Sequence, residues 1–149
     1  MTLHELLALF TSKNIEYTTA HLDAVDQNAQ LTDVASDSRE VTPGSLFVCK
    51  GASFSPAYLA SAVEAGAVAY LCQQSLAEEL QVVAPNVAAI RVDDVRLAMA
   101  YAAADVAGHP DKKLTTIGIT GTKGKSTCSY MLRAILDGDE PYSKCGVIG

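Results

Sequence analysis

The stretch LFVCKGASFSPAYLASAVEAGAVAYLC, residues 46–72, contains the pattern that decides the fold. Its first four residues, 46–49, are all apolar, which is typical of a strand buried on both faces. Pro56 suits the first turn of a helix, and Gly66 is a typical helix stop. A second apolar run, Val68–Cys72, predicts another buried strand. Strand, helix and strand in this order favour an α/β layer architecture.

The same alternation continues on both sides of this stretch. Thr2 and Glu5 fit a capping box at the start of a helix whose apolar residues repeat at helical spacing. Further elements are predicted in alternation: a strand at 31–34, a short helix at 75–80 capped by Ser75, a strand at 87–92, and a longer helix that starts after Asp93 or Asp94 and ends near Gly108. Residues 1–111 are therefore predicted to form one small α/β domain.

A second unit is predicted to start near Lys112 and to run to Gly149. Residues 114–120 are an expected strand, a glycine-rich turn follows, and Lys125–Leu136 carries its apolar residues on one helical face. Residues 145–149 have the composition of another strand's start. Two strands and one helix cannot bury their own apolar surface, because parallel strands are normally covered on both faces. We therefore expect 112–149 to be an incomplete domain and the chain to be the front part of a longer protein. The alternative is a short protein whose last unit packs onto the first domain.

The segment GITGTKGKST, residues 118–127, carries the strongest chemical signal. Glycines allow successive backbone N–H groups to point into one concavity, and the following helix N-terminus adds partial positive charge. Together they predict a phosphate site, with Lys125 directed at the β- and γ-phosphates and Ser126 or Thr127 placing a hydroxyl on Mg²⁺. The strict phosphate-loop pattern requires glycine at position 119, where this chain has Ile119, so the loop is a variant. The alternative is an ordinary glycine-rich turn before a helix.

Two parts of the sequence resemble one known family. Gly121–Thr127, GTKGKST, resembles the ATP loop TGTxGK[ST] of the Mur ligases, although most members have Asn where this chain has Lys123. Ser36–Arg39 and Val41–Val48 resemble the DSR-x-V-x-PG-x-LFV signature of the UDP-binding domain in the family's tripeptide synthetases. The resemblance runs from about Leu31 to Gly149. It implies that the α/β domain 1–111 binds a UDP-sugar and that 112–149 is the strand–loop–helix–strand start of an ATP-binding domain.

The resemblance also implies site residues. Those carried over for the UDP-sugar are Ser36, Ser38, Ala52, Ser53 and Phe54; those for ATP are Gly121, Thr122, Lys123, Gly124, Lys125, Ser126 and Thr127, with Lys125 catalytic and Ser126 and Thr127 near the metal. Many members continue with Asp-Gly-His or Asp-Ser-His where this chain has Ser55-Pro56-Ala57, a departure within the nucleotide-contacting loop. On the residues alone, Asp37 and Arg39 around Ser38 also fit a plain turn, because Asp and Ser favour turns.

The activity that the resemblance implies is an ATP- and Mg²⁺-dependent amide ligation in the synthesis of peptidoglycan precursors. ATP would phosphorylate the carboxylate of UDP-N-acetylmuramoyl-L-alanyl-D-glutamate, and the amine of a third amino acid, lysine or diaminopimelate, would attack the acyl phosphate. We expect this chain alone to be inactive, because the family's remaining site residues follow Gly149. The alternatives are another Mur-type ligase, such as a folylpolyglutamate or cyanophycin-type synthetase, or a module that binds UDP-sugar or nucleotide without catalysis.

Composition limits the other classes of function. The chain has 149 residues, of which 49% are hydrophobic, and its net charge is −6. An acidic balance argues against nucleic-acid partners, which require a basic face. Apolar runs fall short of the roughly 20 residues that span a membrane, and the N-terminus lacks signal-peptide features, so we expect a cytoplasmic protein without membrane insertion. The four cysteines form no CxxC pair and are expected to be free thiols rather than zinc ligands.

Overall fold

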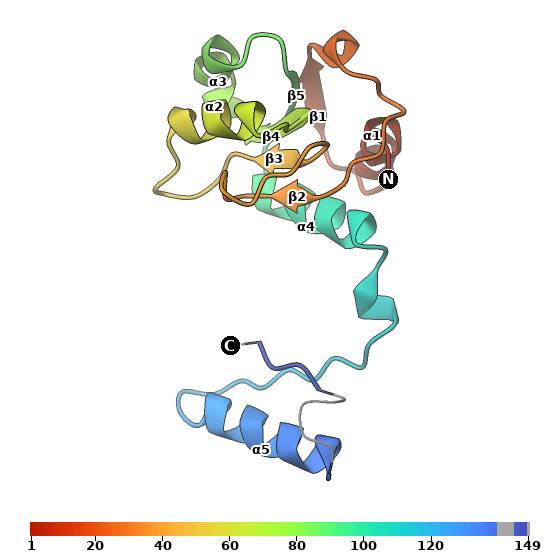
Figure 1. Ribbon diagram of the computed structural model, residues 1–149, viewed down its shortest axis with the longest axis vertical. Coiled ribbons are helices and arrows are strands. Elements are labelled where there is room, and N and C mark those ends of the chain that lie inside the picture. Colours follow the sequence, from red (N-terminus) through yellow and green to blue (C-terminus); the bar gives the residue numbers. More distant parts are fainter. Residues whose placement is uncertain (140–144, 149) are drawn as a thin grey trace. The chain divides into compact units, whose positions relative to one another are not determined.

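The computed structural model, shown in Figure 1, describes residues 1–139 and 145–148. The chain divides into two compact units, Met1–Lys113 and Leu114–Gly149. The first unit contains a five-stranded sheet with helices on both faces, and the described residues of the second contain one helix. The α/β class predicted from the alternation of strands and helices is therefore confirmed.

The sheet of the first unit has the strand order β1-β5-β4-β3-β2. Its strands are β1 (Tyr17–Ala20), β2 (Val34–Ala35), β3 (Leu46–Val48), β4 (Ala69–Gln73) and β5 (Ala88–Val92). Strands β2 to β5 are parallel, and β1 is antiparallel to β5. The carboxyl ends of the four parallel strands therefore lie at one edge of the sheet, together with the amino end of β1.

Four helices cover the two faces of this sheet, two on each face. They are α1 (Leu3–Ser12), α2 (Pro56–Glu64), α3 (Ala77–Val83) and α4 (Val95–Val106), with short 3₁₀ turns at η1 (Leu22–Ala24), η2 (Gln74–Leu76) and η3 (Pro110–Lys112). Helices α2 and α3 lie on one side of the sheet and α4 on the other (Figure 1), where its residues share a core with those of α1. The result is a three-layer α/β/α arrangement.

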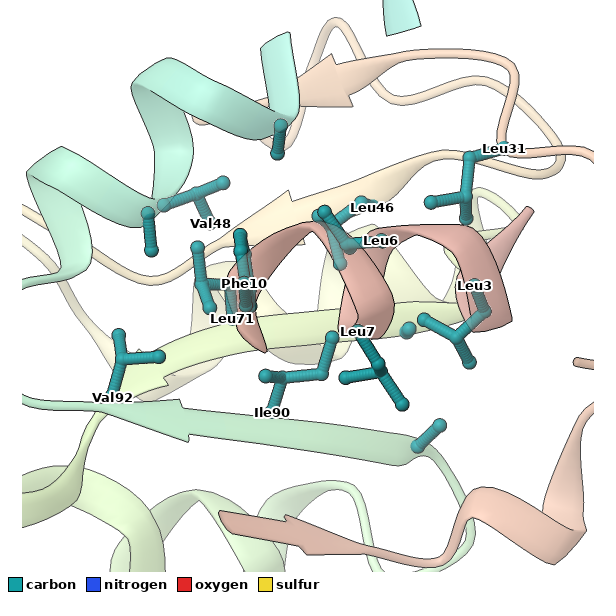
Figure 2. Close-up of a cluster of buried hydrophobic side chains, with 14 residues drawn as sticks. Leu3, Leu6, Leu7, Phe10, Leu31, Leu46, Val48, Leu71, Ile90 and Val92 are labelled. Atoms are coloured by element: carbon teal, nitrogen blue, oxygen red, sulfur yellow. The ribbon is translucent and has the colours of Figure 1, made fainter. Parts of the chain in front are cut away.

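The core between the sheet and helices α1 and α4 follows from two periodicities. Along each strand alternate side chains point to this face, and along α1 the residues spaced by three and four do so. Figure 2 shows the α1 side chains among those of the strands. The larger buried members are Leu3, Leu6, Leu7, Phe10, Leu31, Leu46, Val48, Leu71, Ile90 and Val92.

The opposite face of the sheet packs on α2 and α3, and it contains buried groups that can ionise. Cys49 and Cys72 are free thiols on this face, and burial raises the pKa of both, that of Cys72 to about 11. Tyr70 is also buried, and desolvation raises its pKa to about 12. These groups are therefore neutral at physiological pH, and the two thiols act as small apolar side chains.

Local signals place most of the element boundaries. Thr2 and Glu5 form the predicted capping box, with Glu5 N–H donating to Thr2 Oγ1 over 3.1 Å and Thr2 N–H donating to Glu5 Oε2 over 2.7 Å. After α2 the backbone of Gly66 turns at φ +104°, and a Cβ there would lie 2.9 Å from the Cα of Pro43. This position therefore requires glycine both for its φ angle and for its close approach.

Two boundary predictions are wrong. Ser75 does not cap a helix: residues 74–76 form η2, and α3 begins only at Ala77 without a side-chain cap bond. The strand predicted at 31–34 forms only at Val34–Ala35, because its pairing with β3 starts opposite Leu46. Leu31 is buried, but its N–H donates to the Met1 carbonyl over 2.8 Å instead of joining the sheet. The apolar pattern of residues 31–34 correctly indicated that Leu31 is buried. The start of β2, however, depends on which backbone groups find a hydrogen-bond partner in β3.

Asp94, rather than Asp93, caps α4, and the difference can be tested. The Asp94 carboxylate accepts hydrogen bonds from the N–H groups of Arg96 and Leu97, each over 3.0 Å. We expect Asp94→Ala to lower the free energy of unfolding by about 1 kcal/mol, because it removes these cap bonds. Asp93→Ala is the matched control, since it removes the same charge without a cap, and should change stability by less than about 0.5 kcal/mol. Urea denaturation followed by circular dichroism measures both, and equal losses would contradict the assignment.

The described residues of the second unit contain the predicted helix but not the predicted strands. Helix α5 spans Lys125–Asp137. Residues 114–120 and 145–148 are not in strands, and Gly149 lies outside the described residues. A strand needs a hydrogen-bonded neighbour, and the described part of this unit offers none to residues 114–120, whose Leu114 and Ile117 side chains are exposed. The apolar face of α5 is likewise exposed, with Met131 at 62% and Ile135 at 75%.

Candidate functional site

Two of the predicted segments start from neighbouring strands at the same edge of the sheet. Residues 36–39 follow β2 directly, and residues 49–54 follow β3, which is paired in parallel with β2. In open α/β sheets ligands bind in the crevice outside the carboxyl ends of the strands. Ser36 and Ser38 thus lie on the loop after β2, and Ala52 and Ser53 lie on the loop after the neighbouring strand β3.

The first of these loops is a tight turn centred on Ser38. The Asp37 carbonyl accepts from Glu40 N–H over 3.1 Å, and Asp37 Oδ1 accepts from Arg39 N–H over 3.0 Å. Ser36 is exposed and Ser38 is half-buried. The turn predicted from the residue types is therefore present. It leaves the Ser38 hydroxyl without a protein hydrogen bond in the described part of the chain, so the turn and a ligand contact through Ser38 are compatible.

An ion pair holds this turn. Arg39 Nε donates to Asp37 Oδ1 over 2.9 Å, and the guanidinium also donates to Oδ2. These side-chain bonds, followed by the Arg39 backbone N–H, lower the pKa of Asp37 to about 2. The carboxylate therefore stays ionised at neutral pH, and its support of the turn is lost only as the pH falls through about 2.

The second loop brings an aromatic pair to the same region. Ala52 and Ser53 are exposed, while the half-buried Phe54 packs edge-to-face on Tyr58 with ring centroids 6.4 Å apart. Asp37 chiefly raises the pKa of Arg39, and the charges of Glu40 and Tyr58 contribute in the same direction. Tyr58 was not among the predicted site residues. The spacing of Phe54 and Tyr58 by four at a helix start was the available signal.

The third candidate segment lies in the second unit and is considered by itself. Gly121 has φ +153° and Gly124 has φ +78°, and α5 begins at the next residue, Lys125. The first N–H bonded within the helix is that of Cys128, which donates to the Gly124 carbonyl over 2.9 Å. No side chain caps the helix, so the N–H groups of residues 125–127 are left for a ligand.

The loop geometry fits a phosphate ligand. Lys125 Nζ donates to the Gly121 carbonyl over 2.8 Å, which folds the ammonium over the mouth of the loop. Residues 121–127 are all exposed, so the hydroxyls of Ser126 and Thr127 are accessible. Uncapped N–H groups at a helix N-terminus and a nearby ammonium form an anion site, and serine or threonine oxygen suits Mg²⁺ when phosphate supplies further ligands. Within 1–139 and 145–148, no cluster of three or more His, Cys, Asp or Glu side chains is arranged to hold a metal by itself.

No helix in the described ranges is both long and apolar enough to cross a membrane.

The chain is similar to curated proteins of one kind. It is 45% identical over 105 residues to a UDP-N-acetylmuramyl-tripeptide synthetase of Limosilactobacillus reuteri, covering 70% of this chain and 19% of that protein. It is 38% identical over 124 residues to a UDP-N-acetylmuramoyl-L-alanyl-D-glutamate–2,6-diaminopimelate ligase of Caldanaerobacter subterraneus, covering 82% and 24%. It is 39% identical over 119 residues to the corresponding L-lysine ligase of Enterococcus faecalis, covering 78% and 22%.

These matches extend over most of this chain but over a small part of each relative. The chain spans about a fifth of the length of the relatives it matches. No family model matches the sequence. Relatives named for two different amino acids, diaminopimelate and lysine, match it almost equally well.

Proposed function

Because the chain is homologous over 70–82% of its length to the Mur ligases, we propose that it contributes the UDP-sugar site and the ATP loop of such a ligase. The first unit would hold the UDP end of UDP-N-acetylmuramoyl-L-alanyl-D-glutamate, and the second would hold the phosphates of ATP. The ligase as a whole would add the third amino acid of the peptidoglycan precursor. Bound ATP with Mg²⁺ would supply the phosphoryl group that activates the substrate carboxylate.

The observation that carries the proposal is that residues 36–39 and 52–54 lie on the loops that follow two adjacent parallel strands, β2 and β3. Asp37 and Arg39 hold the backbone turn that carries the half-buried Ser38, and Ala52 and Ser53 are exposed on the loop of the neighbouring strand. Phosphate and ribose oxygens accept or donate hydrogen bonds with such groups, and the Phe54–Tyr58 pair offers an aromatic surface next to them.

The similarity to both lysine and diaminopimelate ligases also supports the proposal that this chain holds the UDP-sugar and ATP but not the amino acid. The residues of this chain would serve the substrates that these relatives share, the UDP-muramoyl peptide and ATP. The pocket that distinguishes the two amino acids would then lie outside the matched region.

A titration with UDP tests the first site on the full chain. We expect Ser38→Ala to weaken UDP binding about three- to tenfold, since one hydrogen bond contributes about 0.5–1.5 kcal/mol. Ser61→Ala, an exposed serine on α2, is the matched control and should bind as the wild type does. Isothermal titration calorimetry gives the affinities. Absence of UDP binding by the wild-type chain, or equal binding by all three proteins, would refute the proposed site.

A further inference from the structure

Two cysteines lie opposite each other at the carboxyl ends of β3 and β4. These strands pair in parallel as far as Val48 and Leu71, and the Cys49 N–H donates to the Leu71 carbonyl over 2.9 Å. The next residues along the two strands, Cys49 and Cys72, are therefore neighbours across the sheet. Both belong to the core under α2 and α3, so their thiols lie on the same face. Both are free thiols and are fully buried.

The strand spacing suits one metal ion between two thiolates. Side chains of opposite residues stand side by side on strands about 4.8 Å apart. A thiolate–metal bond is about 2.3 Å long, so two sulfurs in line with one ion are about 4.6 Å apart. Within 1–139 and 145–148 no group of three or more His, Cys, Asp or Glu side chains is arranged to hold a metal. The pair therefore offers two sulfur ligands, which are too few for a tetrahedral zinc site.

Arg91 continues this row onto the next strand, because it pairs with Cys72 in the ladder between β4 and β5. One Nη donates to Gln81 Oε1 of α3 over 2.7 Å, which places the guanidinium on the same face as the thiols. The Arg91 Nε is buried and has no hydrogen-bond partner among the described residues. Two thiolates with one univalent cation carry a net charge of −1, and the adjacent guanidinium would compensate it in this buried setting.

Without a metal ion both thiols are protonated. Burial chiefly raises the pKa of Cys49, and the charge of Cys72 raises it further. Burial also raises the pKa of Cys72, to about 11, although Arg91 acts in the opposite direction. A cation between the two sulfurs would attract both thiolates and offset their mutual repulsion. Its binding would therefore release two protons.

We propose that Cys49 and Cys72 together bind one soft univalent cation of the Cu(I) class, with Arg91 balancing the charge of the complex. Two S–H bonds lose their protons and two sulfur–metal bonds form, without any transfer of electrons. Thiolate ligands favour Cu(I) over harder cations. The pair lies next to the solvent, because the exposed residues 51–53 and Gln73 follow the two strands. The site does not depend on the proposed ligase function, since it shares no residue with the two candidate nucleotide sites.

A Cu(I) titration tests the site. Exposed Cys128 and half-buried Cys145 are the other thiols, so the full chain is used with both changed, as Cys128→Ser/Cys145→Ser. Under anaerobic competition with bathocuproine disulfonate we expect one Cu(I) per chain, and a tenfold excess of Zn²⁺ should not displace it. The largest amide chemical shift changes should fall on residues 48–50 and 71–73. Absence of binding, displacement by Zn²⁺, or shifts centred elsewhere would overturn the proposal.

Further variants in the same background separate the ligands from the compensating charge. Cys49→Ala and Cys72→Ala, which keep these buried positions small and apolar, should each weaken Cu(I) binding at least 100-fold. Arg91→Gln should weaken it about three- to tenfold, whereas Arg96→Gln, an exposed arginine on α4, should not change it. The arginine pair keeps the proposal testable if a cysteine variant fails to fold. Unchanged binding by a folded Cys72→Ala, or equal affinities of Arg91→Gln and Arg96→Gln, would refute it.

Discussion

Replacing Phe10 with alanine is expected to lower the free energy of unfolding by about 3–5 kcal/mol. Phe10 is fully buried, and it is the largest residue that α1 places in the core between the sheet and α4. Its ring packs against Tyr17 with centroids 6.1 Å apart, and it lies among strand residues such as Val48 and Leu71 (Figure 2). Truncation removes the buried apolar area and leaves a cavity that the rigid strands cannot fill. Domains of this kind are stable by about 5–15 kcal/mol, so much of the margin would be lost.

Phe54→Ala is the matched control for this substitution. It deletes the same atoms, but Phe54 is only half-buried, on a loop with one aromatic contact, to Tyr58. A loss of about 1 kcal/mol is expected there, in line with partial burial. Urea denaturation monitored by far-ultraviolet circular dichroism compares the two variants. A Phe10→Ala loss no greater than that of Phe54→Ala would contradict the placement of α1 in the core.

The first unit was largely predictable because its signals are local and agree with one another. The apolar runs at 46–49 and 68–72 coincide with β3 and β4 to within one residue, and Pro56 and Gly66 bracket the helix between them. The sheet order was not predictable in this way. The sequence of residues 17–20 does not indicate that β1 pairs antiparallel with β5, because its partner residues are roughly seventy positions away.

The second unit shows where pattern alone fails. Residues 114–120 have the composition of a strand and α5 has an apolar face, yet the former are in no ladder and Met131 and Ile135 are exposed. An apolar pattern identifies the residues that favour burial, but it does not provide the neighbouring strand or helix that would bury them. By contrast, α5 starts at the predicted Lys125, because glycine at φ +78° and the periodic residues after it are local features.

The first unit's candidate sites were also predictable only in part. Ser36, Ser38 and the 52–54 segment were predicted from their resemblance to a family signature. In the structure their two loops follow the adjacent strands β2 and β3. Arg91 gave no comparable signal. A lone arginine in a strand suggests a surface residue, and only the fold shows that Arg91 is half-buried and donates a hydrogen bond to Gln81.

The ATP loop gives the second large expected effect. Lys125→Ala should weaken MgATP binding about 10- to 100-fold, because a charge-assisted hydrogen bond to phosphate contributes about 1.5–3 kcal/mol. Lys125 Nζ now bonds the Gly121 carbonyl, a neutral acceptor that phosphate oxygens can replace with a stronger interaction. The uncapped N–H groups at the start of α5 remain in the variant, so weak binding should persist.

Lys113→Ala is the charge-matched control, since it removes one exposed lysine outside the loop. A change in MgATP affinity of the same size in both variants would mean that net charge, and not the loop, determines binding. Gly124→Ala gives an independent check: a side chain at φ +78° strains the turn before α5, so this variant should also bind MgATP more weakly while both lysines are intact. If wild-type chain binds no MgATP in calorimetry, or if Lys125→Ala binds as well as Lys113→Ala, the loop is an ordinary turn before a helix and the ATP site must be built from other residues.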